Sequence, residues 1–462
     1  MGGCVRDLIR QAKPKDWDIT TNANPDQIQA CFAKTVYENK YGTVAIINET
    51  VSDETYKVVE VTPYRLEAAY SDFRHPDSVS FSKNLEDDLK RRDFTMNSIA
   101  YSPSKDLIVD PYQGQEDIKD KVIRSVGKPL DRFEEDALRM LRAVRFSCEL
   151  GFTIEYHTME DIHTSSYLLK EIAEERIRDE FMKMILSDNP MGGVIMAEKL
   201  GLLEFIIPEL KEGIGCEQNA DHIYDVWEHC LRALNHAAER KWSLEVRLAA
   251  MMHDIGKPRS RVWSEENKDW TFYGHDVIGA KLVEKIMKRL KFPRNIADNV
   301  DKLVRYHMFF SDVDQITLSA VRRIVRNVGP EHVWELMNVR ACDRIGMGRP
   351  KETPYRLRKY ESMIEEAMRA PISVSMLKID GAKILEMGEK PGPKIGWILH
   401  ALLEEVLDDP NLNTAEYLED KTRKLIAMDT QDLKKLGEAG KEKKGEIEDA
   451  EIAEIRKKHW VK

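Results

Sequence analysis

The pattern of apolar and polar positions predicts two kinds of structure along the chain. The segments TVAIINE at 43–49 and YKVVEVTPYR at 56–65 are rich in β-branched residues, so we expect two neighbouring strands there. From about Pro129 onward, apolar residues recur at helical spacing. The segment RFEEDALRMLRAVRFSCELGF at 132–152 predicts one helix that stops at Gly151, and EIAEERIRDEFMKMIL at 171–186 predicts the next. The fold class is therefore α+β, with a mixed sheet and helices followed by an all-helical remainder.

Changes in composition divide the 462 residues into four expected segments. The mixed sheet and its helices should occupy the first of them, and helices the second. Histidines become frequent in the third, and the fourth is helical with a charged C-terminus. From about Thr430 the chain is so rich in charge that it predicts either a solvated helix or partial disorder. The expected boundaries are 1–125, 126–205, 206–350 and 351–462.

Composition excludes several classes of protein. A hydrophobic content of 42% without an apolar run of about 20 residues predicts no membrane partner. The polar N-terminus is not typical of a signal peptide. The six cysteines have no CxxC spacing, which argues against a disulfide framework or a zinc ribbon and favours a cytoplasmic location. The net charge of −10 argues weakly against nucleic acid as a partner, but a local basic face decides such binding.

A first candidate site lies in KDWDIT at 15–20, where Asp16 and Asp18 alternate with an aromatic residue. On a strand, residues two apart face the same way, so the two carboxylates would repel each other unless a cation lay between them. Oxygen ligands of this kind suit Mg²⁺, which also binds substrate phosphates. Glu60, on a strand expected next to this one, would complete the ligand set, because Val59 and Val61 flank it and should point into the core. The alternative is a solvated turn with two surface charges.

Groups that suit phosphate and sugar recognition lie near this carboxylate pair in the sequence. Two glycines at the start leave backbone N–H groups unobstructed, and Arg6 follows them near a helix start, which is the chemistry that a triphosphate requires. The segment RRDFTMN at 91–97 adds charge for phosphates and polar groups for a sugar, although such a segment is often a solvated helix face. The candidate nucleotide-binding residues are Gly2, Gly3, Arg6, Arg91, Arg92, Asp93 and Asn97.

Asp136 and Arg139 form a second candidate site, three residues apart on one face of the helix expected at 132–152. A carboxylate only accepts hydrogen bonds and a guanidinium only donates them. Cytosine and adenine each offer an amino donor beside a ring acceptor, whereas uracil and guanine show the reverse pattern. An Asp/Arg pair can therefore accept C and A and reject U and G. The alternative is a salt bridge within the helix.

The order of these motifs resembles the class II tRNA nucleotidyltransferase and bacterial poly(A) polymerase family. The resemblance covers about the first 185 residues and rests on GGCVRD, KDWDITTNA, EVTPYR, DFRHPDSVSF, LKRRDFTMNSIAY, DPYQGQEDI and RFEEDALRMLRAVRF. It implies a nucleotidyltransferase head followed by a helical neck, body and tail. It also implies two metal ions at Asp16 and Asp18 with Glu60 nearby, and a nucleotide-selecting role for Asp136 and Arg139. Arg142 and Arg145 would hold Asp136, the phosphates or the helix itself.

This family normally carries a helix and a strand before the Gly-Gly turn, so we expect one strand of the head to be missing from this chain. The reaction implied is the addition of C, C and A to tRNA 3′ ends from CTP and ATP, with Mg²⁺ as cofactor. The segment YRLEAAYSDFRHPDSVSF at 64–81 resembles the flexible loop of CCA- and A-adding enzymes. A poly(A) polymerase is the first alternative. The second is a metal phosphohydrolase whose head serves only to bind RNA.

A third site is predicted from DVWEHCLRAL, MMHDIGKP, FYGHDVIGA, RYHMFF and RACDRIG, which together resemble the HD phosphohydrolase superfamily. Imidazoles and carboxylates together suit a transition metal or Mg²⁺. The resemblance implies a divalent metal of unknown identity and phosphatase or cyclic phosphodiesterase activity, with Lys257 available for a substrate phosphate. We expect His222 and His236 to be surface residues. The predicted ligands are His229, His253, Asp254, His275, His307 and Asp343.

Overall fold

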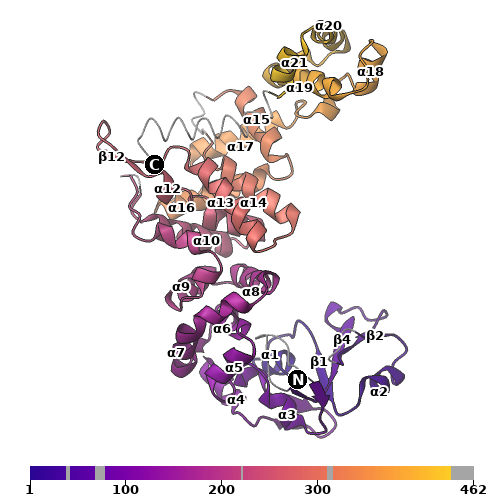
Figure 1. Cartoon of the computed structure of the whole chain (residues 1–462), viewed down its shortest axis with the longest axis vertical. Coiled ribbons are helices and arrows are strands. Elements are labelled where there is room, and N and C mark those ends of the chain that lie inside the picture. The colour runs from indigo at the N-terminus through magenta and orange to yellow at the C-terminus, as the bar shows by residue number, and fades with distance from the viewer. Residues whose placement is uncertain (38–41, 68–78, 220–221, 310–315, 439–462) are drawn as a thin grey trace. The chain divides into compact units, whose positions relative to one another are not determined.

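The structure is a computed structural model that describes residues 1–37, 42–67, 79–219, 222–309 and 316–438. The chain forms two compact units, residues 1–208 and 209–462 (Figure 1). The tail from residue 439 and the middle of the segment at 64–81 lie outside the described residues, so the predictions for them stay predictions.

A four-stranded mixed sheet forms the head of the first unit, in the order β1-β4-β3-β2. Strand β1 (Asp18–Thr21) runs parallel to β4 (Val58–Pro63), and β3 (Val44–Ile47) lies antiparallel to β4 and to β2 (Thr35–Tyr37). The two strands expected at 43–49 and 56–65 are therefore confirmed as neighbours. On one face of the sheet, apolar side chains of β3 and β4 pack against helix α2 (Pro25–Ala30), which buries Ile28.

The rest of the first unit is mostly helical, with short two-stranded pairs between the helices. The additional strands are β5 (Arg65–Glu67), β6 (Val79–Phe81), β7 (Ala100–Ser102), β8 (Leu107–Val109), β9 (Val122–Ile123) and β10 (Thr153–Ile154). The helices are α1 (Gly3–Ile9), α3 (Leu85–Lys90), α4 (Gly114–Asp120), α5 (Pro129–Glu135), α6 (Leu138–Leu150), α7 (Tyr156–Ser165), α8 (Glu174–Leu186) and α9 (Pro190–Lys199).

The single helix predicted for 132–152 is wrong in one respect, because the chain breaks it at Asp136. This residue ends α5 with extended backbone angles (φ −147°, ψ 101°), and α6 begins two residues later. The Asp136 Oδ1 atom accepts a hydrogen bond from the backbone N–H of Leu138 (3.2 Å), as a residue before a helix start commonly does. The predicted stop is confirmed, since Gly151 ends α6 with a left-handed φ of 68°.

The second unit is helical apart from one β-hairpin, as far as the structure describes it. Helix α10 packs against α11 and α16, and α13 packs against α14, which places these helices around a common core. The hairpin consists of β11 (Val262–Ser264) and β12 (Asp269–Thr271). The helices are α10 (Val226–Glu239), α11 (Leu244–Met252), α12 (Lys257–Ser260), α13 (His275–Arg289), α14 (Arg294–Tyr306), α15 (Leu318–Val328), α16 (Val333–Gly346), α17 (Tyr355–Ala367), α18 (Gly381–Glu386), α19 (Pro393–Asp408), α20 (Ala415–Ile426) and α21 (Thr430–Glu438).

The α+β class is thereby confirmed, with the sheet of the head followed by helices. Among the described residues, none of these helices has both the length and the apolar character that crossing a membrane requires.

Candidate functional site

A cavity of about 540 Å³ in the first unit collects most of the residues predicted for nucleotide transfer. Strands β1 and β4 supply its carboxylates, the segment after α3 supplies arginines, and α6 and α8 supply further charged side chains. Arg6, Arg145, Asn97, Asp16 and the two glycines do not line it. The predicted residues that line it are Asp18, Glu60, Arg91, Arg92, Asp93, Asp136, Arg139 and Arg142.

Asp18 and Glu60 are register partners on the parallel strands β1 and β4. Neighbouring strands are about 4.8 Å apart, so both carboxylates reach the cavity side by side. Val59 and Val61, on either side of Glu60, are buried as expected. Burial raises the pKa of Asp18, and the charge of Asp16 raises it further against the effect of Arg92. Two close carboxylates of this kind form an oxygen donor set that fits a divalent cation.

Asp16 differs from Asp18 in its position. Strand β1 begins only at Asp18, and Asp16 is an exposed residue in the bend before it. The two-residue alternation of a strand therefore does not apply to the pair. Asp16 nevertheless lies close enough for its charge to act on Asp18. Its role as a metal ligand stays a prediction.

Of the two glycines at the start of the chain, Gly2 lies against an arginine of the cavity. Gly2 has a left-handed φ of 75°, and a Cβ atom there would lie 2.3 Å from Nη1 of Arg92. A larger residue at this position would displace the Arg92 guanidinium. Gly3 starts α1, so the expected helix start is confirmed. Arg91 forms an ion pair with the fully buried Asp88 (2.7 Å), which holds its guanidinium in place.

A chain of polar contacts holds Asp93 at the cavity wall. Arg142 binds its Oδ2 atom through Nε and Nη2, at 3.0 and 2.7 Å. Asn97 donates to its Oδ1 atom (3.1 Å) and accepts from Arg6 (2.9 Å). Burial alone would raise the pKa of Asp93, but the charge of Arg142 and its hydrogen bonds hold that pKa well below its usual range. Four of the predicted nucleotide-binding residues thus form one connected network.

This network makes a prediction about stability and pH. Asp93→Asn should lower the free energy of unfolding at pH 7 by about 3 kcal/mol, because it leaves the Arg142 charge with only the longer ion pair to Glu180 (3.7 Å). A depressed pKa gives stability that is present above the usual value of 3.8 and is lost as the pH falls below it. The difference in melting temperature between wild type and variant should therefore shrink between about pH 4 and pH 2. A difference that stays constant over this range would contradict the assignment.

Asp136 and Arg139, the pair predicted to read the base, have different protein partners in the structure. Asp136 is paired with Arg176 of α8 through both carboxylate oxygens, at 3.2 and 2.7 Å. Arg139 donates to Glu135 (2.6 Å) and to the backbone oxygen of Arg91 (2.8 Å). The two residues do not share a helix face, and the salt bridge within one helix that was the alternative reading of this pair is wrong. Both still line the same cavity, so they can meet one base.

Arg145 lies outside the cavity, and its contacts hold α6 in place against α8. Its Nε atom donates to Glu180 of α8 (2.5 Å), and its Nη1 atom donates to Glu149 (2.7 Å). Its guanidinium also lies 3.9 Å from the centre of the Phe146 ring. Of the roles expected for Arg145, these contacts fit the one of holding the helix.

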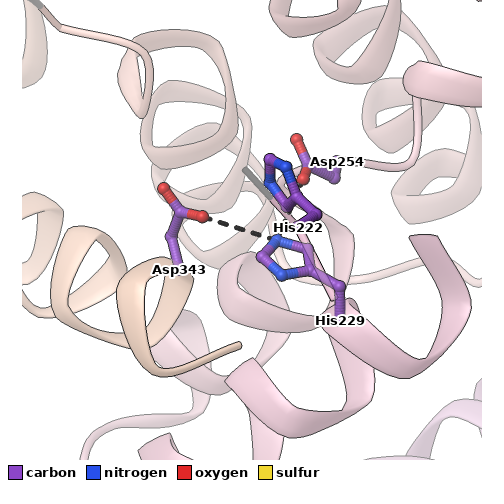
Figure 2. Close-up of side chains that lie close together, drawn as sticks. All are labelled: His222, His229, Asp254 and Asp343. Atoms are coloured by element: carbon purple, nitrogen blue, oxygen red, sulfur yellow. Dashed lines mark ion pairs between the residues drawn. The ribbon is translucent and has the colours of Figure 1, made fainter. Parts of the chain in front are cut away.

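The histidines and aspartates predicted as metal ligands form a buried cluster in the second unit. Figure 2 shows three of them, His229, Asp254 and Asp343, together with His222. The Nε2 atom of His229 in α10 lies 3.0 Å from Oδ2 of Asp254 and 3.4 Å from Oδ1 of Asp343. The Nε2 atom of His253 lies 2.8 Å from that of His229 and 3.3 Å from Asp254 Oδ2. All four side chains are buried. His229 comes from α10, Asp343 comes from α16, and His253 and Asp254 lie in the turn after α11.

The other oxygen of Asp254 faces a second pair of histidines. Its Oδ1 atom lies 3.3 Å from Nε2 of His275 and 3.6 Å from Nε2 of His307. The Nδ1 atoms of both histidines are tied to backbone oxygens, of Phe272 and Val304, at 2.7 Å each. These contacts direct each Nε2 atom towards Asp254, as the corresponding Nδ1 contacts do in histidines that bind metals. Asp254 therefore stands between two donor sets, with one oxygen for each.

The donor set fits a divalent metal on structural grounds. The buried Oδ2 atom of Asp254 has no hydrogen-bond partner in good geometry, although three nitrogens lie within 3.3 Å of it. Burial opposes both shifts, yet the charges of Lys257 and His253 hold the pKa of Asp254 well below its usual value, and Asp254 raises the pKa of His253 to about 10. The buried carboxylates of the cluster thus attract positive charge, which a divalent cation would supply.

Sequence reasoning missed His222, which it placed at the surface. This residue is half-buried, and one of its ring nitrogens lies within 4.8 Å of a ring nitrogen of His229 and of a carboxylate oxygen of both Asp254 and Asp343 (Figure 2). Its Nδ1 atom contacts Asn219 Oδ1 (2.7 Å), and burial together with Lys257 lowers its pKa to about 4. His236 is also buried, next to Glu352 (2.7 Å). His222 precedes α10, which begins at Val226, so helical spacing offered no signal for its position.

The fold and the first cavity define a nucleotidyltransferase: a parallel strand pair carries two carboxylates beside arginines, and helices follow. Sequence models match in three segments of the chain: the poly A polymerase head domain at 1–124, the probable RNA and SrmB-binding site of polymerase A at 151–214, and the HD domain at 226–336.

Known proteins match the chain along most of its length. An A-adding tRNA nucleotidyltransferase of Deinococcus radiodurans is 33% identical over 87% of this chain and 90% of its own. A CCA-adding enzyme of Lactobacillus helveticus is 30% identical over 91% and 92%. The crystal structure of the Bacillus stearothermophilus CCA-adding enzyme in complex with CTP has a TM-score of 0.66 at 26% identity and covers 92% of each chain. The chain belongs to the class II tRNA nucleotidyltransferase and poly(A) polymerase family.

Proposed function

We propose that this chain is a CCA-adding tRNA nucleotidyltransferase, which adds C, C and A to tRNA 3′ ends from CTP and ATP. The observation that carries the proposal is the cavity of the first unit, where the Asp18 and Glu60 carboxylates face arginines and the Asp136 and Arg139 pair. Relatives named as CCA-adding enzymes support it, as does a similar structure that binds CTP.

The chemistry follows from the charges around the cavity. The 3′-hydroxyl oxygen of the RNA forms a bond to the α-phosphorus of the nucleotide, the bond from that phosphorus to the β-phosphate oxygen breaks, and pyrophosphate leaves. The hydroxyl proton passes to water. Asp18 and Glu60 would hold Mg²⁺, which when bound lowers the pKa of the hydroxyl and neutralises phosphate charge. Arg91 and Arg92 bring positive charge to the phosphates.

Selection of the nucleotide falls to Asp136 and Arg139. In the structure each has a protein partner, Arg176 for the carboxylate and Glu135 for the guanidinium. A cytosine or adenine edge offers the same donor and acceptor pattern that these partners offer. Nucleotide binding would then exchange one set of hydrogen bonds for another. Asp136 and Arg139 keep partners in both states, and the released Arg176 and Glu135 side chains are partly exposed, so water can solvate them.

Asp136→Ala tests this selection. It removes the acceptor for the amino group shared by C and A, so discrimination against UTP and GTP should fall by about 10- to 100-fold, as the loss of 1–3 kcal/mol from a bidentate contact implies. The measurement is kcat/KM for each of the four nucleotides. Asp179→Ala is the matched control, because Asp179 lines the same cavity but pairs with Arg178. Unchanged selectivity in Asp136→Ala would exclude the pair as the base reader.

Addition of adenosine alone is the second candidate function, because the relative from Deinococcus radiodurans is named an A-adding enzyme. The test uses tRNA that ends before CCA, tRNA that ends in CC, and each labelled nucleotide separately. A CCA-adding enzyme incorporates CTP on the first substrate and ATP on the second. Incorporation on the second substrate only would support A addition, and long adenylate tails would support a poly(A) polymerase.

We further propose that the second unit is a divalent-metal phosphohydrolase, with phosphatase or cyclic phosphodiesterase activity. The support is the pair of donor sets that Asp254 joins, set in a cavity of about 690 Å³. A divalent metal held there would activate water toward a phosphate ester. Lys257 lies 2.7 Å from Asp254 Oδ2 and lines the cavity, so its ammonium can meet a substrate phosphate.

A further inference from the structure

We infer that Arg340 is a specificity-determining residue of the second unit, which favours phosphate monoesters over phosphate diesters there. The inference rests on the proposed phosphohydrolase function and deepens it. Arg340 lies in α16, three residues before Asp343, and lines the same cavity as the histidine–aspartate cluster. The predicted ligand set did not include it.

The position of Arg340 follows from its ion pair with Asp343. Its Nη1 atom lies 2.5 Å from Oδ2 of Asp343, while Oδ1 of the same carboxylate lies 3.4 Å from His229 and 3.6 Å from His253. One oxygen of Asp343 therefore faces the donor set and the other faces Arg340. This contact fixes the guanidinium at the edge of the cluster.

The guanidinium keeps donors available for a ligand. An arginine side chain has five N–H groups, and among the described residues Asp343 is the partner found for those of Arg340. Its side chain is about one-fifth exposed, toward a cavity that it lines. Planar pairs of N–H groups match two oxygens of a phosphate, which makes arginine suited to this recognition.

Lys257 supplies a second cation from the other side of the cluster. It is anchored on Asp254, whereas Arg340 is anchored on Asp343, and His229 lies between these two carboxylates. Lys257 and Arg340 are positive charges in addition to those of the metals. They should therefore bind a ligand with two negative charges more tightly than a ligand with one. A phosphate monoester carries about two negative charges above pH 7, whereas a diester carries one.

The rest of the cavity wall suits an apolar or aromatic ester group. Trp270 and Phe272 line it from the hairpin region, and Tyr273 and Met308 line it with about half of their surfaces exposed. Aromatic rings bury large areas and stack on flat groups. The inferred ligand class is thus a phosphate monoester of an aromatic or otherwise flat group.

The test compares two probes, p-nitrophenyl phosphate and bis(p-nitrophenyl) phosphate, at pH 8 with Co²⁺-loaded full-length protein. Arg340→Gln should lower kcat/KM for the monoester by 10-fold or more and change that for the diester less than threefold. Arg340→Lys should recover part of the loss. Arg344→Gln is the matched control, because it lies one turn further along α16 and contacts the backbone of Lys351 instead of the cluster.

A binding measurement accompanies the kinetics. Calorimetry with inorganic phosphate should show weaker binding to Arg340→Gln than to wild type and to Arg344→Gln, at equal cobalt content. Equal loss on both esters, or loss of cobalt from Arg340→Gln, would mean that Arg340 only positions Asp343, and the inference fails. If the wild type hydrolyses neither probe, the phosphohydrolase function itself fails, which is a different result from an active enzyme with an unchanged preference.

Discussion

Asp18→Ala should abolish nucleotide addition, with a loss on the order of a thousandfold or more, or about 4 kcal/mol of barrier. The carboxylate lies next to Glu60 in the cavity, and no other described strand offers a register partner to Glu60 on that side of the sheet. RNA binding should stay nearly unchanged. The measurement is single-turnover addition of labelled CTP to a tRNA that lacks its 3′ end.

The same variant separates catalysis from folding. Burial raises the pKa of Asp18, so its ionised form is disfavoured in the folded protein, and alanine should not lower the melting temperature at pH 7. Asp26→Ala removes an exposed carboxylate from α2 and is the matched control. Asp16→Ala, measured beside it, shows whether the exposed Asp16 also holds metal. Activity of Asp18→Ala within tenfold of wild type would be too small a loss for a metal ligand.

Asp254→Asn should remove metal binding from both donor sets of the second unit, because each oxygen of this carboxylate faces one set. With Asp254 intact we expect the second unit to bind two Co²⁺ ions. In the variant the affinity for both should fall on the order of a hundredfold or more, exceeding the 10- to 100-fold typical of changes to residues that contact a metal ligand but not the metal. Titration by calorimetry and visible absorption measures this, in an Asp18→Ala background that removes the head site.

His307→Ala is the comparison that makes the result specific. His307 faces only the Oδ1 side of Asp254, so its loss should release one of the two ions and leave the other. Nucleotide addition, measured without the Asp18 change, should survive both substitutions, because the two cavities lie in separate units. Equal cobalt binding in Asp254→Asn and His307→Ala would refute the bridging role. Circular dichroism checks that each variant is folded.

Much of the fold could be predicted from the sequence, because its signals are local. The β-branched runs around Val44 and Val59 form neighbouring strands, and the apolar spacing from Pro129 onward forms helices that end where glycine allows a left-handed turn. Glu60 was predicted beside Asp18 from its buried neighbours alone, and the parallel register of β1 and β4 places it there. Hydrophobic periodicity reports which side of an element is buried, and that information is contained in a few adjacent residues.

The sequence by itself thus determined the fold class and the family, and it predicted most of the residues that line the two cavities. Only the tertiary structure decided how those members are paired. Helix α5 ends at Asp136, which pairs with Arg176, forty residues further along the chain. His222, in the segment before α10, lies next to the cluster because its Nε2 atom contacts the Lys257 ammonium (3.5 Å). Such contacts depend on where distant segments meet after packing, and a charge or an imidazole carries no periodic signal that reveals its partner in advance.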